Sequence, residues 1–235
     1  MTMAFSPFIP GAEAERSAAA DARTVVLLHG LGRTSRSMNK MAGALARAGY
    51  VVENIGYPST EHEFDALLAF VSDALEACCG ARDRRLNFVT HSLGGIIVRA
   101  YAEKNGIADI GRVVMLSPPN QGSELVDELK DISLFRWIAG PTGRRLGTDP
   151  ASIQSGLGPV RFELGVITGN SSFNPLYSRL IPGPDDGKVS VERAKVAGMM
   201  DFMVLPHTHS FIMNSDEVIQ QTLYFLEHAR FDHDP

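Results

Sequence analysis

The chain has 235 residues, enough for one domain with a sizeable core, and its hydrophobic fraction of 44% and charged fraction of 21% are those of an ordinary soluble protein. The formal net charge of -5, with no basic run, gives no electrostatic reason to expect nucleic acid as a partner. The longest apolar stretches fall far short of a membrane span. These features exclude a bilayer-embedded protein and argue against a nucleic-acid-binding one.

The N-terminal residues 1–23 lack the basic start and the continuous apolar stretch of a secretory signal. We therefore expect an irregular leader on a cytoplasmic protein, with secretion left open should a signal have been removed. Cys78 and Cys79 are adjacent in a predicted helix, where neighbouring side chains diverge. A structural disulfide is not expected, which fits a reducing compartment.

Short β-rich apolar runs alternate with longer helical stretches, a pattern that predicts a parallel sheet with helices on both faces. The strands are expected at residues 24–28, 50–55, 86–90, 112–116, 162–168 and 201–205. The regular helices are expected at residues 38–48, 64–79, 93–104 and 215–229. With no internal repeat and no linker, residues 24–235 are expected to form a single domain.

The pattern is less regular between residues 118 and 158. Within this stretch, residues 132–138 (ISLFRWI) bring together too many apolar side chains for a plain solvent loop. One interpretation is a helix packed on the sheet. The other is a small cap over an active site, because long excursions in compact domains are often functional.

Residues 89–95 read VTHSLGG and place Ser92 between a predicted strand and a predicted helix. A serine hydroxyl is a useful nucleophile only when it projects clear of the backbone and a base removes its proton. A tight strand-to-helix turn meets the first need in the G-x-S-x-G elbow. Thr90 departs from that pattern, since its branched side chain stands where glycine is usual. An ordinary glycine-rich helix start remains the alternative.

A second glycine-containing loop ends the first strand, where residues 25–32 read VVLLHGLG. Glycine lets such a loop turn its backbone N–H inward. We expect the N–H groups of Leu31 and Leu93 to form an oxyanion hole. A phosphate-binding loop is disfavoured, because the chain has no G-x-x-x-x-G-K-[ST] and lacks the third glycine of a dinucleotide fingerprint.

The stretches VVLLHGLG and THSLGG, in this order, resemble the α/β-hydrolase superfamily, and within it the compact bacterial lipases and carboxylesterases. The resemblance covers nearly everything from Thr24 to Phe231. It implies a three-layer α/β-hydrolase fold, with a mostly parallel sheet of about six strands between helices. It also implies a catalytic triad in the order Ser, Asp or Glu, then His.

The C-terminal third supplies an acid and a base that match the family's order. Asp186 and His209 are preferred over their neighbours Asp185 and His207, because of the D-x-x-V register after Asp186 and the apolar residues after His209. His209 would take the proton of Ser92, and Asp186 would orient the imidazole. His29 and His91 are expected beside the site, whereas His62, His228 and His233 are expected in solvent.

The resemblance implies a carboxylic-ester hydrolase that needs no cofactor and no metal, since no clustered Cys or His spacing indicates a metal site. Its partner would be a small-molecule or lipid-like ester, with the oligomeric state left open. An acyltransferase or thioesterase would use the same triad. A non-catalytic binding module of the same fold is a further alternative, although a pure binder has no need of all three residues.

Overall fold

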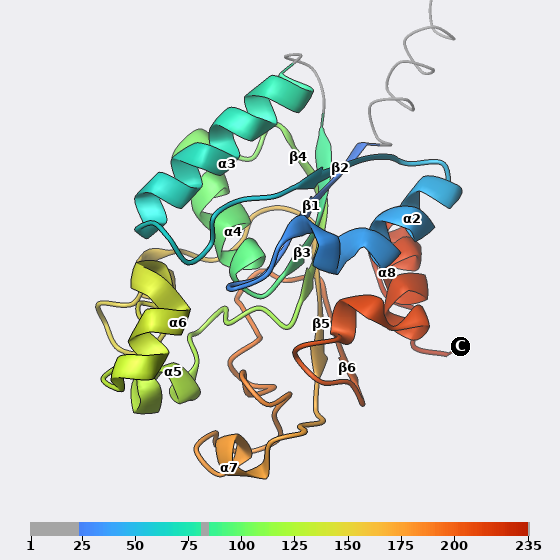
Figure 1. The fold of residues 1–235 in the computed structure, drawn as a ribbon. Coiled ribbons are helices and arrows are strands. Elements are labelled where there is room, and N and C mark those ends of the chain that lie inside the picture. Colours follow the sequence, from blue (N-terminus) through green and yellow to red (C-terminus); the bar gives the residue numbers. More distant parts are fainter. Residues whose placement is uncertain (1–23, 81–84, 235) are drawn as a thin grey trace, which may run out of the picture.

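A computed structural model describes residues 24–80 and 85–234 of the chain, so the leader at residues 1–23 lies outside the described residues. Six parallel strands form one sheet in the order β2-β1-β3-β4-β5-β6 (Figure 1). The strands are β1 (Thr24–Leu28), β2 (Val51–Ile55), β3 (Leu86–His91), β4 (Ile110–Leu116), β5 (Leu164–Gly169) and β6 (Asp201–Leu205). The expected six-stranded parallel sheet is confirmed.

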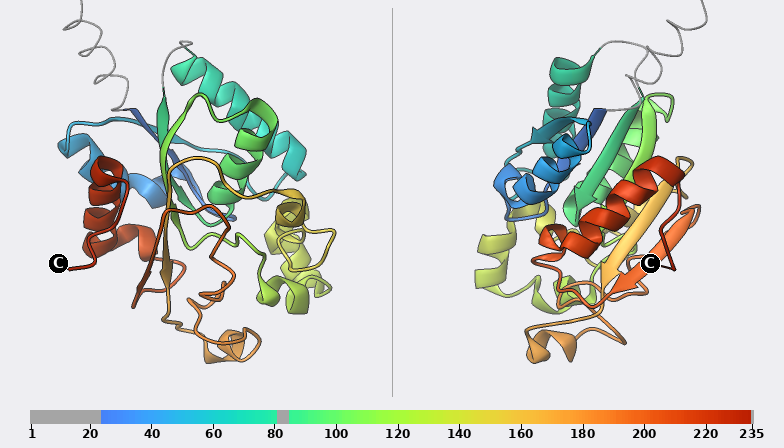
Figure 2. Two further views of the ribbon diagram at one scale, coloured as in Figure 1. Left: turned by 180° about the vertical axis from the view of Figure 1, so that it is seen from behind. Right: turned by 90° about the vertical axis from the view of Figure 1, so that its right-hand side faces the viewer.

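Helices cover both faces of this sheet, as expected (Figure 2). One face carries α3 (Phe64–Cys79) and α4 (Leu93–Asn105), whose apolar residues pack with Val26, Phe88 and Val113. The other face carries α2 (Asn39–Arg47) and α8 (Asp216–His228), which pack with strand residues such as Val25 and Val89. Successive strand residues thus point to opposite cores, which explains why the inner strands are buried at nearly every position.

The predicted bounds of the regular elements agree closely with the structure. The limits of β1, α3 and β6 are those expected, and the other predicted strands and helices differ at their ends by a residue or two. The apolar stripe of α3, made of Leu67, Leu68, Val71 and Leu75, is buried. Periodicity was informative here because most buried positions of these elements are apolar.

The irregular stretch after β4 contains two helices and a short 3-10 turn. These are α5 (Glu124–Leu129), α6 (Ser133–Gly143) and η2 (Ile153–Gly156). A non-helical residue, Gly140 with φ 65°, precedes Pro141 and kinks α6. In Figure 1, α5 and α6 lie beyond the carboxyl ends of the strands rather than on either face of the sheet, as does the short α7 (Pro175–Ser178).

The expectation that Cys78 and Cys79 do not bridge is wrong. The structure joins them by a disulfide between adjacent residues, with their Cα atoms 3.8 Å apart. They are the last two residues of α3, just before its C-cap Gly80, so the expectation drawn from helix interiors does not hold at this helix end. The cysteines therefore give no support to the expected reducing compartment.

Within residues 24–80 and 85–234, no helix has the length and apolar character needed to cross a membrane.

Candidate active site

The candidate site lies where the order of the sheet reverses. From β1 the chain moves to β2 on one side, and then returns to β3 on the other side of β1. The loops after β1 and β3 therefore leave the same edge of the sheet in opposite directions. In open parallel sheets this point leaves a crevice outside the carboxyl ends of the strands, where ligands bind.

Ser92 occupies the turn between β3 and α4 with φ 52° and ψ −118°. A positive φ in a residue other than glycine costs about 1–3 kcal/mol and is held only by surrounding structure. Here the Ser92 N–H donates to the Leu116 carbonyl at 2.9 Å, and its carbonyl accepts from Gly95 at 3.0 Å. Gly94 is also required, since a Cβ there would lie 2.6 Å from the Leu28 carbonyl oxygen. These backbone hydrogen bonds thus hold Ser92 in the turn between β3 and α4.

His209 lies between Ser92 and Asp186 and contacts both. Its Nε2 is 3.1 Å from the Ser92 Oγ, and its Nδ1 is 2.9 Å from the Asp186 Oδ2. The three residues come from the turn after β3, the loop after α7 and the loop after β6. All three are buried, with 8%, 4% and 2% of the surface of Ser92, His209 and Asp186 exposed. The structure therefore brings the predicted serine, histidine and aspartate into one hydrogen-bonded chain.

Backbone N–H groups hold the Asp186 carboxylate in place. Its Oδ1 accepts from Lys188 N at 3.0 Å and Val189 N at 2.8 Å, while the His209 N–H donates to the Asp186 carbonyl at 2.9 Å. Burial alone would raise the pKa of Asp186, but the charge of His209, its hydrogen bond and the Val189 N–H together lower the pKa. Asp186 therefore stays ionised beside the imidazole.

The neighbouring candidates Asp185 and His207 are engaged elsewhere. Asp185 accepts from Ser178 Oγ at 2.9 Å and from the Gly187 N–H at 2.7 Å. His207 Nε2 lies 2.9 Å from both Glu217 Oε2 and Ser215 Oγ, at the start of α8. Neither residue contacts Ser92 in the described part of the chain.

His91 forms a hydrogen bond with the backbone of His209. Its Nε2 lies 2.9 Å from the His209 carbonyl oxygen, so this nitrogen carries the proton and donates it. The other nitrogen, Nδ1, is buried without a hydrogen-bond partner among the described residues. Burial, followed by the nearby charge of His209, holds the pKa of His91 well below 6.5. A neutral His91 is thus part of the scaffold that positions the loop of His209.

The loop after β1 is held by an aromatic contact. His29 stacks on Tyr57 with ring centroids 4.1 Å apart, accepts the Tyr57 N–H at Nε2 and donates from Nδ1 to the Gly30 carbonyl. The Gly32 N–H donates to Ser59 Oγ at 3.0 Å. The N–H groups of Leu31 and Leu93 donate to no other group of the described residues.

A pocket of about 320 Å³ opens beside Ser92 and His209. Leu31, Arg33 and Lys188 form part of its rim, and α5 and α6 contribute most of its apolar lining. The lining residues from these helices and the following turn are Leu125, Val126, Leu129, Phe135, Ile138, Ala139 and Leu146. The stretch that sequence patterns left irregular therefore supplies much of the lining of this pocket.

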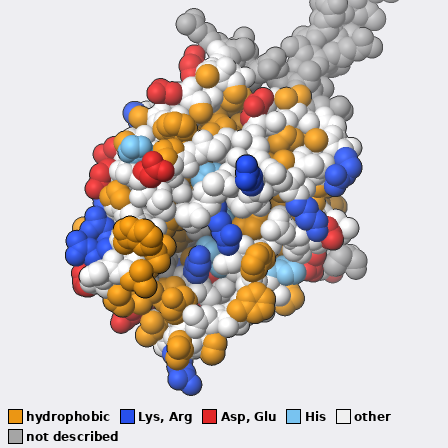
Figure 3. All heavy atoms as spheres, viewed as in Figure 1, with side chains coloured by type: hydrophobic (Ala, Val, Ile, Leu, Met, Phe, Trp, Pro, Cys, Tyr) orange, Lys and Arg blue, Asp and Glu red, His pale blue; other side chains and the backbone are white. Residues whose placement is uncertain are grey.

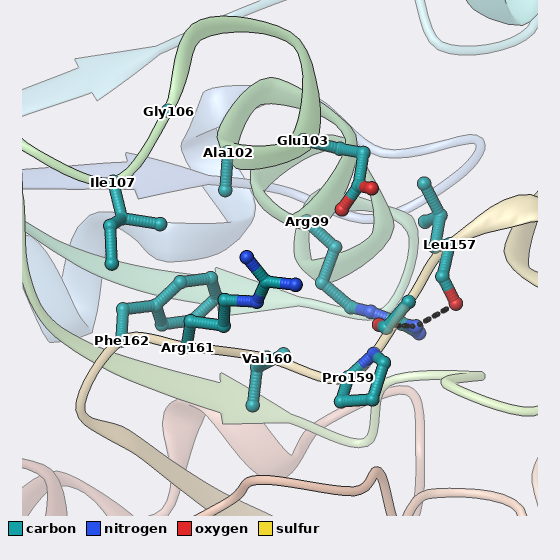
Figure 4. Close-up of a pocket in the computed structure, with 11 residues that line it drawn as sticks. Arg99, Ala102, Glu103, Gly106, Ile107, Leu157, Pro159, Val160, Arg161 and Phe162 are labelled. Carbon is teal, nitrogen blue, oxygen red and sulfur yellow. Dashed lines mark hydrogen bonds between the residues drawn. The ribbon is translucent and has the colours of Figure 1, made fainter.

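A second cavity, of about 230 Å³, lies away from Ser92, between α4 and residues 157–162 (Figure 4). Its most buried member is Arg99, whose guanidinium points toward the Leu157 carbonyl. Arg99 also donates to the carbonyls of Asn120 and Gly158. Burial lowers the pKa of Arg99 to about 10, which leaves it charged at neutral pH. This side chain joins α4 to two loops and takes no part in the site of Ser92.

Two groups of site residues were not found from the sequence. Tyr57 and Ser59 belong to a GYPST stretch after β2, where the Pro and Ser content indicated only a turn. A parallel sheet brings this turn to the same edge as the loop after β1, and that topology was the usable signal. The other group is α5, whose six residues are too few for a periodic pattern.

The structure resembles bacterial lipases and esterases. A mature lipase of Bacillus licheniformis aligns with a TM-score of 0.69 at 19% identity, covering 87% of this chain and 91% of that one. A carboxyl esterase from a metagenome aligns with a TM-score of 0.65 at 18% identity, covering 80% and 65%. A phospholipase of Legionella pneumophila aligns with a TM-score of 0.58 at 20% identity, and only 45% of that chain is covered. At these identities the likeness concerns the fold.

The sequence itself gives a direct family assignment. No curated protein sequence matches the chain significantly. The sequence profile of the alpha/beta hydrolase family, however, matches residues 25–218, which include β1, the turn of Ser92, and the loops of Asp186 and His209. This match extends over most of the chain, and the observed sheet agrees with it. The chain therefore belongs to the alpha/beta hydrolase family.

Proposed function

We propose that the protein is a serine hydrolase that cleaves carboxylic esters through Ser92, His209 and Asp186. The observation that carries the proposal is His209, whose two ring nitrogens lie 3.1 Å from the Ser92 Oγ and 2.9 Å from the Asp186 Oδ2. This distance pattern gives the hydroxyl a base and gives the base an orienting carboxylate. The strained backbone of Ser92 and the apolar pocket beside it support the same reading.

In the first half of the reaction, His209 Nε2 accepts the Ser92 proton while Oγ attacks the ester carbonyl carbon. The carbonyl π electrons move to oxygen and form a tetrahedral oxyanion. When that intermediate collapses, the bond to the alcohol oxygen breaks, and His209 gives the proton to the leaving alkoxide. The products are the free alcohol and an acyl ester of Ser92.

In the second half, a water molecule takes the place of the alcohol. His209 removes a proton from the water as it attacks the acyl carbon, and then returns this proton to Ser92 Oγ as the carboxylic acid leaves. Asp186 stays ionised throughout and stabilises the imidazolium, in keeping with its lowered pKa. The enzyme is thereby restored without any cofactor.

The N–H groups of Leu31 and Leu93 are the proposed oxyanion donors. Neither N–H donates a hydrogen bond within the described residues. Leu31 precedes Gly32, whose N–H donates to Ser59 Oγ, and Leu93 follows Ser92 in the turn before α4. A donor of this kind contributes about 3–4 kcal/mol to transition-state stabilisation. His29 and Tyr57 act as positioning residues, because their stacked rings support the loop that carries Leu31.

The pocket indicates esters with an apolar acyl group of modest size. Its lining from α5 and α6 is aliphatic or aromatic, and its volume of about 320 Å³ lies at the lower end of ligand pockets. An acyl chain that exceeds this volume would have to extend through the open side of the pocket. We therefore propose that short and medium acyl chains are accommodated fully.

The proposal is tested with a series of p-nitrophenyl esters from acetate to palmitate, assayed with the wild-type protein and with Ser92→Ala. Wild-type turnover that falls by at least about 10⁴-fold in Ser92→Ala is the expected result. A fluorophosphonate should also modify the wild-type protein at Ser92, located by peptide mass. Folded protein that hydrolyses none of these esters, or that is labelled at another residue, would overturn the proposal.

A further inference from the structure

Exposed apolar side chains are concentrated at the open side of the pocket. Of the fourteen large hydrophobic residues that are exposed in the described chain, eight lie in residues 132–138 and 173–180. We call these eight the mouth patch. They are Ile132, Leu134, Trp137, Ile138, Phe173, Leu176, Tyr177 and Leu180. Scattered apolar residues are normal on a protein surface, but a cluster of this kind marks a contact surface.

The mouth patch is continuous with the pocket of Ser92. Ile138 and Tyr177, one from each segment, line that pocket together with Ser92 and His209. Figures 1 and 2 place α6 and α7 at the same end of the molecule, beyond the carboxyl ends of the strands. In Figure 3, hydrophobic side chains gather over this end, with Lys and Arg side chains beside them. Whatever covers the mouth patch thus also faces the opening of the pocket.

The exposed side of α6 is apolar although its inner side is already used. Phe135 and Ala139 face the pocket, whereas Trp137 and Leu134 are 81% and 64% exposed. A helix that only closed the pocket would carry polar residues on its outer side. The apolar outer side therefore requires a second apolar environment, outside the described chain.

The two segments of the mouth patch carry only positive charges. Residues 132–138 and 173–180 contain no Asp or Glu, and each segment carries one arginine, Arg136 or Arg179, although the whole chain has a net charge of -5. Arg33 and Lys188 line the same pocket as Ile138 and Tyr177 of these segments. None of these four cations forms an ion pair with a carboxylate of the described residues.

We propose that the mouth patch docks on the surface of an anionic lipid aggregate, with the apolar side chains inserted among the acyl chains and the four cations at the headgroups. Apolar insertion flanked by cations is the combination that binds anionic lipid surfaces. A second copy of the chain fits less well, because a symmetric contact would bring the Arg136 and Arg179 side chains of both copies together, and the two segments supply no carboxylate of their own. That a docked lipid ester then reaches Ser92 rests on the proposed function.

The only tryptophan of the chain, Trp137, belongs to the mouth patch and reports docking directly. The full-length Ser92→Ala variant is titrated with vesicles of equal parts phosphatidylcholine and phosphatidylglycerol, and with vesicles of phosphatidylcholine alone. We expect the tryptophan emission to move to shorter wavelength and the protein to co-sediment with the anionic vesicles. Binding to them should weaken as salt is raised, because screening reduces the attraction of the cations.

Two variants separate the mouth patch from general stickiness. Leu134→Ser combined with Leu176→Ser should weaken vesicle binding at least about tenfold, because both leucines are exposed and neither lines the pocket. Phe70→Ser is the matched control, since Phe70 is also exposed but lies on α3. It should bind as the parent protein does.

The inference is overturned if the anionic vesicles leave the tryptophan emission unchanged, or if the double variant binds as tightly as Phe70→Ser. A dimer that dissociates in the double variant would assign the mouth patch to a second copy instead. Hydrolysis of soluble p-nitrophenyl butyrate by the wild-type protein is measured in parallel. Vesicle binding without this hydrolysis supports docking and rejects the proposed function, whereas hydrolysis without vesicle binding does the reverse.

Discussion

At the scale of single residues, the site depends on which of two histidines contacts Ser92. His209 does, through its Nε2, whereas His207 is held at the start of α8 by Glu217 and Ser215. The two residues are only two positions apart, on the loop that follows β6. Their difference is set by tertiary contacts, and a substitution at each position measures it.

His209→Ala should lower kcat on p-nitrophenyl butyrate by about four orders of magnitude, because it removes the one base that the described residues place within hydrogen-bonding distance of Ser92. His207→Ala should retain kcat within about a factor of three and lose at most about 1 kcal/mol of stability with its partly exposed contact to Glu217. Steady-state kinetics and urea unfolding of both variants check this. A larger loss of kcat in His207→Ala would transfer the role of base to that residue.

His91 makes folding stability depend on pH. Because the pKa of the buried imidazole is held well below 6.5, the unfolded chain binds a proton at this residue at pH values where the folded chain does not. The stabilising contribution of neutral His91 is therefore complete above about pH 6.5 and is lost as the pH falls from there toward the folded-state pKa.

His91→Gln keeps an N–H donor for the His209 carbonyl but removes this titration. Below about pH 6.5, the free energy of unfolding of the wild-type protein should fall with pH more steeply than that of the variant, by up to about 1.4 kcal/mol per pH unit. Urea unfolding at a series of pH values measures both slopes. The pKa of His29 is also lowered by burial, but that contribution is common to both proteins. Parallel slopes would show that His91 does not titrate as described.

At the scale of elements, the sequence predicted those parts whose side-chain pattern is set by burial on a known face. The strands β1 and β3 are buried at every position because helices cover both faces, and α3 has one continuous buried stripe. The turn of Ser92 could be placed because it must follow β3 and precede α4. Asp186 and His209 followed from the order of residues in the resembling family, not from any periodic pattern.

Elements whose form depends on distant residues could not be predicted in this way. The six residues of α5 are held by contacts such as the Asp127 carboxylate with the Thr148 N–H, at 3.0 Å. The support of the loop after β1 by Tyr57 joins two turns through the ring of His29, which no local signal reveals. The Cys78–Cys79 disulfide was not expected, because neighbouring side chains diverge in a helix interior, whereas these two residues lie at a helix end.

A substitution of Arg99 tests how much the contacts between elements contribute to stability. The buried guanidinium donates to the carbonyls of Asn120, Leu157 and Gly158, and so ties α4 to both ends of the stretch that forms the pocket wall. Arg99→Met should lose about 3 kcal/mol of stability, since the buried carbonyl of Asn120 and the part-buried carbonyls of Leu157 and Gly158 lose a charged donor. Lys195→Met is the control: the ion pair of Lys195 with Glu192 is exposed, so its loss should cost under about 1 kcal/mol.

Urea unfolding of the two variants compares these costs. Equal losses would show that the Arg99 bonds add nothing beyond a surface contact. The Ser92 site should be affected only indirectly, because the cavity beside Arg99 does not adjoin it. The kcat of Arg99→Met on a short ester is accordingly expected to stay near the wild-type value as long as the variant is folded.

At the scale of the whole molecule, the sheet positions the three site residues, whereas helices outside the sheet supply most of the pocket lining. Ser92, Asp186 and His209 all lie on loops at the carboxyl ends of strands, where the paired sheet holds them in place. The lining of the pocket comes mainly from α5 and α6, which are packed on the loops and not on the sheet. Substrate size and reactivity should therefore respond to different substitutions.

Val126 on α5 tests this separation. This residue lines the pocket and is only 9% exposed, but it forms no hydrogen bond with the three site residues. Val126→Phe places extra volume in the pocket and should lower kcat/KM for p-nitrophenyl octanoate relative to acetate by about tenfold, the effect of about one methylene of fit. Val126→Ala should change the same ratio in the opposite direction. Thermal unfolding of both variants shows whether the core has been disturbed.

The ratio is the informative quantity, since a general loss of folded protein lowers both rates equally and leaves it unchanged. A decrease confined to the longer ester would place the acyl chain between α5 and Ser92, in the space that the wall encloses. An unchanged ratio in both variants would place the acyl chain elsewhere, and the lining of α5 would then serve the alcohol side of the ester. Since acetate occupies little of either space, its rate reports on Ser92 and His209 alone, and their geometry is fixed by β3 and β6 rather than by the wall.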